Sequence, residues 1–483
     1  MASFLSSPMN RAPLSFRLSR LLWAAVLVTL PVTNFRYFPF LGATTYVRPL
    51  AAYPLALLLV VLFWRWWRER EPFPWRNALW PLVLFLCAWG LSTAFGAWLD
   101  PLPLRGQEYV ERALRAWVTF GLGLAFFLAS IWMNQDEESL RFSLRWLMVG
   151  LVANLLWSAV QMIAFYTPLI SISTIREWQF SFSMRAPLKT GRVSGLTMEP
   201  SWLGAQMFSL YLPWFFAALF DRFSPTGRRG WDFLLGFCSV LVLFASYSRS
   251  GILITIFTFF LAALITAREA LGKGWRWFWD GFRAGKTALG MRLLFLALVG
   301  VALIGAGLFL ARHPYFAALW NVRAENLSDY LVKIYAGPRA AYALSALAAW
   351  ERSPILGVGA GAAGFYMYPA LPEWVITFVP EIARHLTPQS VLFPNPKNLY
   401  ARLLAESGLL GFVLFLVFWF HFLADVLSLA RGSAFGRAVA RAAVFFFIAI
   451  ALYHLTQDSL AQPNLWILPG MVVGLTPAER RHT

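Results

Sequence analysis

Long apolar runs alternate along the chain with short, polar, arginine-rich connections. About twelve of these runs approach the ~20 residues that an α-helix needs to cross a bilayer. The pattern therefore predicts an all-α, polytopic membrane protein that forms a single membrane domain over residues 1–483. The runs cover residues 18–33, 49–64, 77–96, 116–133, 146–165, 200–220, 231–247, 250–267, 293–311, 406–424, 440–457 and 463–476.

The interval 312–397, between the ninth and tenth runs, contains no apolar run of membrane-spanning length. Residues 330–350 are rich in Ala and Leu and carry Pro338 near their start, which predicts a helix that ends before Pro354. The glycines of 357–361 predict a turn with free backbone N–H groups. Long structured loops between spans are usually functional, so we expect this loop to cover a site.

The sequence is strongly basic. The sequence has 41 Lys and Arg against 23 Asp and Glu, a formal charge of +18. In a soluble protein this would suggest nucleic acid, but the chain is 59% hydrophobic and contains no nucleic-acid-binding module. We therefore interpret the basic residues as markers of cytoplasmic loops.

Orientation follows from the distribution of these basic residues. If the N-terminus is cytoplasmic, the inside segments carry more than twice as many Lys and Arg as the short outside loops. We therefore expect both termini in the cytoplasm. Arg192, Glu199, Arg249 and the 312–397 loop would then share the outer face, where ATP is absent and a donor must arrive already activated.

Glu199 is the first candidate for chemistry. Pro200 follows it and is suited to the first turn of a helix, so Glu199 would lie at the positive end of that helix. Arg192 precedes it across a glycine-containing turn. Two interpretations stay open, a helix cap with a structural ion pair or a carboxylate that acts as a general base on an acceptor hydroxyl.

Arg249 is the second candidate, and it lies between two apolar runs with almost no loop. Tyr247, Ser248 and Ser250 flank it with hydroxyl groups. An interfacial arginine can snorkel to lipid headgroups. The flanking hydroxyls favour the alternative, a guanidinium that binds phosphate oxygens in a bidentate manner.

Four further residues belong to the same predicted face. Arg339 alone is typical of a helix surface, His385 is a single loop histidine, Lys397 can be a flanking charge, and Asn398 is expected near the start of a helix.

No His, Cys, Asp or Glu cluster has metal-ligand spacing, so we expect neither a metal nor a cofactor. Several arginines in an extracytoplasmic membrane site fit a lipid diphosphate, whose leaving group they would neutralise.

At these residues the sequence resembles the superfamily of O-antigen ligases and O-antigen (Wzy-type) polymerases. The resemblance is carried in order by Arg192 with Glu199-Pro200-Ser201, by Ser246-Tyr247-Ser248-Arg249-Ser250-Gly251, by Arg339 with Pro354-Ile355-Leu356-Gly357-Val358-Gly359, and by Asn398-Leu399-Tyr400 with Glu406-Ser407-Gly408-Leu409-Leu410-Gly411. It implies an inverting, metal-independent glycosyltransferase of a bacterial inner membrane. It also implies a polyprenyl-diphosphate-linked oligosaccharide as donor, with its diphosphate near Arg249 and Arg339.

Lys397 departs from the family pattern, in which a histidine often precedes the asparagine of the last motif. The identity of the base is therefore open, with Glu199 as the first candidate and His385 as the second. The departure favours a polymerase that joins lipid-linked repeats, with a chain-length regulator as a further partner. The alternatives are a ligase that passes the glycan to lipid A–core or to a protein, and a non-catalytic transporter of lipid-linked glycans.

Overall fold

The computed structural model describes residues 13–37, 45–185, 191–283, 285–312, 314–387 and 389–477. The two chain ends, for which the charge pattern predicts a cytoplasmic location, fall outside these ranges. The described part is all-helical and contains only isolated bridges in place of strands. The all-α prediction is therefore confirmed for these residues.

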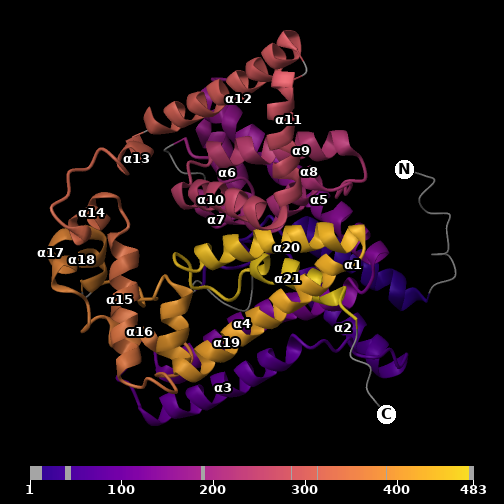
Figure 1. Cartoon of the computed structure of the whole chain (residues 1–483). Coiled ribbons are helices and arrows are strands. Elements are labelled where there is room, and N and C mark those ends of the chain that lie inside the picture. The colour runs from indigo at the N-terminus through magenta and orange to yellow at the C-terminus, as the bar shows by residue number, and fades with distance from the viewer. Residues whose placement is uncertain are drawn as a thin grey trace.

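The helices follow one another through the whole chain (Figure 1). In order they are α1 (Leu14–Thr29), α2 (Ala52–Arg68), α3 (Leu79–Trp98), α4 (Tyr109–Met133), α5 (Glu137–Tyr166), α6 (Ile172–Phe182), α7 (Pro200–Gln206), the π-helix η4 (Met207–Tyr211), α8 (Leu212–Phe220), α9 (Arg229–Ala245), α10 (Arg249–Thr266), α11 (Arg268–Arg283), α12 (Lys286–Arg312), α13 (Pro314–Ala317), α14 (Leu327–Lys333), α15 (Gly337–Glu351), α16 (Ala363–Met367), α17 (Glu373–Phe378), α18 (Pro380–Leu386), α19 (Leu399–Arg431), α20 (Ala434–Tyr453), the 3-10 helix η5 (Pro463–Leu465) and α21 (Ile467–Gly474).

Each predicted apolar run coincides with a helix or with consecutive helices. Within the described residues, seven helical segments are both long and apolar enough to cross a membrane. They are Leu79–Trp98, Tyr109–Met133, Glu137–Tyr166, Pro200–Phe220, Arg249–Thr266, Leu399–Arg431 and Ala434–Tyr453. The chain is thus a membrane protein with several apolar helices, while the count of twelve spans stays a prediction.

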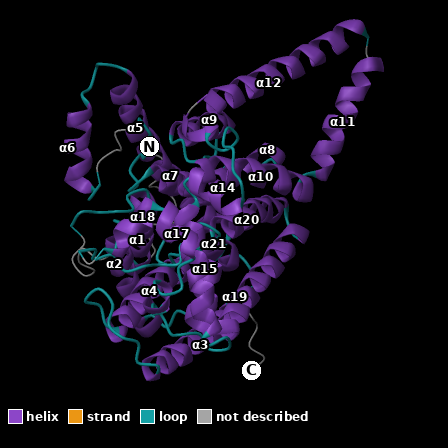
Figure 2. Ribbon diagram, turned by 90° about the vertical axis from the view of Figure 1, so that its left-hand side faces the viewer, coloured by secondary structure: helices purple, strands orange, loops and turns teal. Residues whose placement is uncertain are grey.

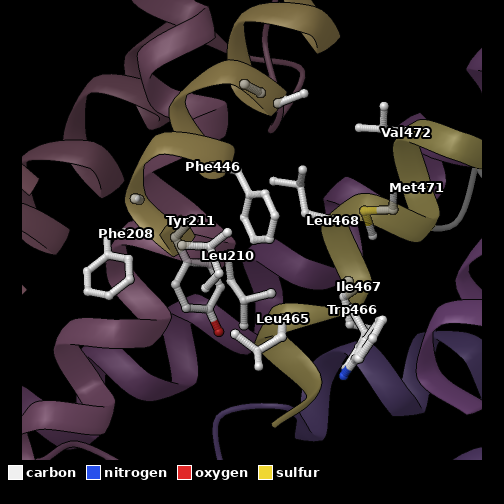
Figure 3. Packing of buried hydrophobic residues seen from close by; sticks show 14 of the residues in the cluster. Phe208, Leu210, Tyr211, Phe446, Leu465, Trp466, Ile467, Leu468, Met471 and Val472 are labelled. Atoms are coloured by element: carbon white, nitrogen blue, oxygen red, sulfur yellow. The ribbon is translucent and has the colours of Figure 1, made fainter. Parts of the chain in front are cut away.

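The last apolar run forms the centre of the bundle. All eight residues of α21 are buried, and the helix packs against α4 and α20. Trp466 precedes it and contacts the rings of Phe120 and Phe127, as part of the core in Figure 3. A helix that is apolar all round belongs inside a protein or a membrane, and here the protein surrounds it.

The 312–397 loop forms a separate helical layer at one end of the bundle (Figure 1). Its own apolar cluster joins α15 to α18 with the first turns of α19, through residues such as Tyr342, Met367 and Ile382. The prediction of a helix with Pro338 near its start that ends before Pro354 is confirmed by α15, which has Pro338 in its first turn. The chain breaks between α14 and α15, where Tyr335 adopts a left-handed φ of 59°.

The glycine-rich turn packs against a kink in α19 and differs from the expectation of free N–H groups. The amides of Val358 and Gly359 donate to the carbonyls of Ala405 and Glu406, at 2.8 and 3.2 Å. In return the amides of Leu409 and Leu410 donate to Pro354 and Ile355, at 2.8 and 3.1 Å. Gly408 lies at the centre of the kink, with φ 61° and ψ −168°. The turn therefore satisfies the backbone that the kink exposes.

Helices α11 and α12 stand apart from the bundle as an extended hairpin (Figure 2). The main packing partners of α12 are α11 and α13, and its side chains are largely exposed. The site described below lies elsewhere, between the loop layer and the ends of α7, α10, α19 and α20.

Candidate functional site

Glu199 occupies the N-cap position of α7, with Pro200 as the first helical residue, as the sequence predicts. Its carboxylate forms an ion pair with Arg185 at 3.2 Å and accepts a hydrogen bond from the Ser201 hydroxyl. The Glu199 side chain is 27% exposed, so it lies at the surface of the bundle, within reach of a solute. Arg192 donates from Nε to the Ser246 carbonyl at 3.1 Å and thereby ties this segment to the α9–α10 turn.

The α9–α10 turn holds Arg249 through a strained backbone. Tyr247 is buried and has a left-handed φ of 47°, which is uncommon for a residue other than glycine. The Ser248 hydroxyl caps α10 by accepting from the Gly251 amide at 3.2 Å. Ser250 is half-buried in the first turn of α10. The hydroxyl of Ser248 thus helps to shape the turn that presents Arg249.

Arg249 reaches into the long loop. Its Nη2 donates to the carbonyl of Ile334 at 2.8 Å, in the turn between α14 and α15. Arg339, five residues later, is exposed in the first turn of α15. One hydrogen bond therefore joins the turn that holds Arg249 to the loop that carries Arg339.

Glu199 belongs to the same neighbourhood. The starts of α7 and α10 pack closely, because a Cβ placed on Gly251 would lie 3.2 Å from Cα of Gly204. Glu199 and Arg339 both act electrostatically on the hydroxyl group of Tyr453, at the end of α20. The start of α7, which carries Glu199, thus lies beside the start of α10, which carries Arg249, and Arg249 contacts the loop that carries Arg339.

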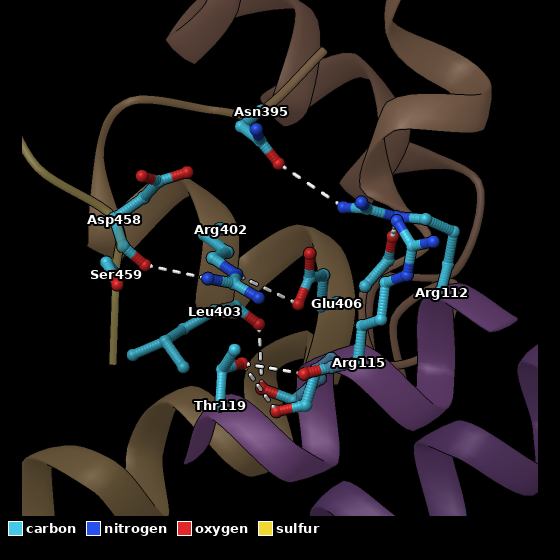
Figure 4. A network of polar contacts seen from close by, with 12 residues as sticks. Arg112, Arg115, Thr119, Asn395, Arg402, Leu403, Glu406, Asp458 and Ser459 are labelled. Carbon is cyan, nitrogen blue, oxygen red and sulfur yellow. Dashed lines mark hydrogen bonds and ion pairs between the residues drawn. The ribbon is translucent and has the colours of Figure 1, made fainter. Parts of the chain in front are cut away.

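A second charged cluster lies beside the start of α19 (Figure 4). Arg402 donates from Nε to Glu406 at 3.0 Å and from Nη1 to the Asp458 carbonyl at 2.8 Å. The side chains of Arg402 and Glu406 are only 14% and 4% exposed. Arg112 lies opposite and donates to Asn395 at 3.4 Å. The pair is therefore buried, and partners from the loop and from α4 surround it.

Lys397 and Asn398 join this cluster to the loop. The Lys397 amide donates to the carboxylate of Asp458 at 3.3 Å, and its side chain is exposed. Asn398 caps α19 by accepting from the Ala401 amide at 3.0 Å, which confirms its predicted place at a helix start. It also donates to the Leu455 carbonyl at 3.2 Å.

His385 lies on α18, where we expected an irregular loop. Its Nδ1 is 2.8 Å from the Tyr342 hydroxyl, and the two rings are stacked. Burial lowers the pKa of His385 below its ordinary value, and Lys397 and Arg384 lower it further against the opposing effect of Glu381. His385 is therefore neutral at neutral pH and has a positive neighbour in Lys397.

The loop after α20 connects Tyr453, at the end of that helix, with Asp458 of the Arg402–Glu406 cluster. The Tyr453 hydroxyl is 3.4 Å from Nε2 of Gln457, and Oε1 of Gln457 accepts from the Asp458 amide at 2.9 Å. Sequence reasoning missed this connection. Arg402 and Glu406 did carry a signal, since opposite charges four residues apart on an apolar helix form a pair. Nothing in the local sequence marks Arg112 or Asp458, because folding alone brings them to α19.

Comparison with known families now bears on this geometry. Residues 234–416 match the family model described as O-antigen ligase. The resemblance to the O-antigen ligase and polymerase superfamily is confirmed. The matched segment contains Arg249, Arg339, His385 and Lys397, while Glu199 precedes it. No curated protein matches the chain.

Proposed function

We propose that the protein is a membrane glycosyltransferase that joins polyprenyl-diphosphate-linked oligosaccharide repeats by inverting, metal-independent transfer on the periplasmic face. The observation that carries the proposal is the contact of Arg249 with the Ile334 carbonyl, five residues before Arg339 in the same loop. Two guanidinium groups at one site can neutralise the diphosphate as it leaves the sugar. The resemblance to the superfamily supports the same reaction class.

Each site residue has a distinct role in this proposal. Arg249 and Arg339 bind the diphosphate, and Arg192 holds the turn that presents Arg249. Glu199 positions or deprotonates the acceptor hydroxyl from the edge of the bundle, where its carboxylate is partly exposed. Lys397 and Asn398 line the acceptor side, and the 312–397 loop covers the site and selects sugars.

The general base is Glu199 in this proposal, with His385 as the second candidate. His385 is neutral at neutral pH and so can accept a proton, but Nδ1 of its ring is occupied by the Tyr342 hydroxyl. Glu199 needs only to release Arg185 in order to bind the acceptor hydroxyl, and the Arg185 side chain is 45% exposed. Exposed ion pairs contribute little to stability and are therefore easily exchanged.

A ligase is the second candidate, favoured by the description of the matched family. It would transfer the same glycan to lipid A–core or to a protein. Lys397, in the place of the histidine that ligases require, favours the polymerase. A defined polyprenyl-diphosphate oligosaccharide separates the two, because a polymerase lengthens it when no other acceptor is present.

The test uses the full-length protein, purified in detergent, with that donor. Arg249→Ala and Arg339→Ala should each lower the rate of transfer by at least ~10²-fold, because each removes a cation that stabilises the leaving group. Arg323→Ala is the matched control, since Arg323 is an exposed arginine of the same loop. Near-normal transfer by both site variants would refute the diphosphate site.

A further inference from the structure

A groove between α5 and α9 lies outside the site described above. Its volume is about 390 Å³, and Arg145 and Arg228 line it together with Trp231. Met148, Val152 and Leu235 provide apolar walls. We propose that this groove binds an anionic phospholipid of the bilayer, with its phosphate at the two arginines and an acyl chain along the apolar walls.

The geometry of the two helices places the charges at one level. The far ends of α5 and α9 both meet the segment after α6, since Gln161 accepts from the Ser194 amide at 3.0 Å and the Ala245 carbonyl accepts from Val193 at 3.1 Å. The helices therefore run in the same direction, and they pack against each other (Figure 1).

On each helix, an apolar wall residue follows the arginine at the same spacing. Val152 comes seven residues after Arg145, and Leu235 comes seven residues after Arg228. Seven helical residues rise ~10 Å, so both arginines lie at one end of the groove and both apolar side chains lie about two turns further along. A polar end above an apolar slot has the shape of a phospholipid headgroup above its chain.

Charge complementarity selects an anion. Among the described residues, no acidic side chain lines the groove. The nearest carboxylate in sequence, Asp232, lines a different pocket, and its oxygens accept hydrogen bonds from Ser224 and from Thr226 of the groove. Basic pockets between membrane helices recognise anionic headgroups, and guanidinium groups bind phosphate in a bidentate manner.

Trp231 indicates where the groove lies relative to the membrane surface. Its side chain is 51% exposed, beside the arginines at the start of α9. Tryptophan prefers the boundary between headgroups and hydrocarbon. This boundary is the level at which the phosphate of a lipid with its chain in the groove would lie. The charge pattern of the sequence predicts that this end of the bundle faces the cytoplasmic leaflet.

The experiment measures lipid binding to the full-length protein in detergent by native mass spectrometry, with no glycan donor present. Phosphatidylglycerol should bind more tightly than phosphatidylcholine of the same chain length. Arg145→Ala/Arg228→Ala should weaken phosphatidylglycerol binding roughly 30-fold, which corresponds to about 1 kcal/mol for each arginine near a membrane surface. Phosphatidylcholine binding should change little.

Two further variants make the result specific. Arg222→Ala/Arg431→Ala removes two exposed arginines from the same end of the bundle and should leave binding unchanged. Val149→Trp fills the groove from a position that is 47% exposed and should weaken both lipids while keeping the charges. Equal affinity for the two lipids, or an equal loss in the Arg222 and Arg431 control, would overturn the proposal. So would unchanged binding by Val149→Trp.

Discussion

Replacing Arg402 by methionine leaves the Glu406 carboxylate buried without the guanidinium that it faces. The two side chains are 14% and 4% exposed and meet at 3.0 Å, so water cannot take the place of the lost partner. Removing one member of a buried ion pair costs about 3–5 kcal/mol of folding free energy. The Asp458 carbonyl also loses its hydrogen-bond donor.

The expected magnitude lies at the lower end of that range, about 3 kcal/mol. Arg112 also acts electrostatically on Glu406 and compensates part of the loss. Glu406→Leu should cost about as much, because it leaves the Arg402 charge buried. The double variant, Arg402→Met/Glu406→Leu, replaces the pair by apolar groups and should cost only about 1 kcal/mol, the value of the hydrogen bond to Asp458.

The assay is unfolding of the full-length protein by SDS titration in mixed micelles, for the wild type, both single variants and the double variant. The decisive result is the order of stability, in which the double variant is more stable than either single variant. If the two single losses simply add in the double variant, Arg402 and Glu406 are not coupled. The interpretation of a desolvated ion pair would then be wrong.

Two other perturbations test the kink and the histidine. Gly408→Ala should destabilise the protein by more than about 2 kcal/mol, because its backbone conformation is restricted to glycine and an added Cβ would collide with the Ile355 carbonyl. Gly432→Ala, at the end of the same helix, is the control, and equal thermal stability of the two variants would contradict this reasoning. Burial lowers the pKa of His385 in the folded protein, so its stabilising contribution is present above the unfolded value of about 6.5 and is lost as pH falls through the folded pKa. His385→Gln should therefore flatten the fall in thermal stability between pH 7 and pH 5, and an unchanged slope would refute the assignment.

The positions of the membrane helices were predictable because hydrophobic runs are a local property of the sequence. The run over 440–457, for example, corresponds to α20 at Ala434–Tyr453. The start of α15 was predictable, because Gly337 and Pro338 interrupt the Ala- and Leu-rich stretch and Pro338 suits the first turn of a helix. The break between α14 and α15 provides the Ile334 carbonyl that Arg249 contacts, and this tertiary contact was not predictable from the local sequence.

The candidate site was predictable only in part for the same reason. Arg249 and Glu199 were recognisable because a charged group at the end of an apolar run costs free energy near a bilayer, so its presence there points to a function. The residues around Arg249 and Glu199 were not predictable. Arg185, Tyr453 and Asp458 reach the site only through the packing of separate helices. The glycine-rich turn was misjudged because its amides bind α19, which the local sequence does not reveal.

The exchange of backbone hydrogen bonds between the glycine-rich turn and the kink of α19 has a consequence for biogenesis. The ribosome makes the turn first, so the amides of Val358 and Gly359 and the carbonyls of Pro354 and Ile355 lack their α19 partners until Ala405 to Leu410 emerge. Backbone groups cannot stay unpaired in hydrocarbon. The turn must therefore stay in water until it docks, and its docking completes only after the following helix has been synthesised.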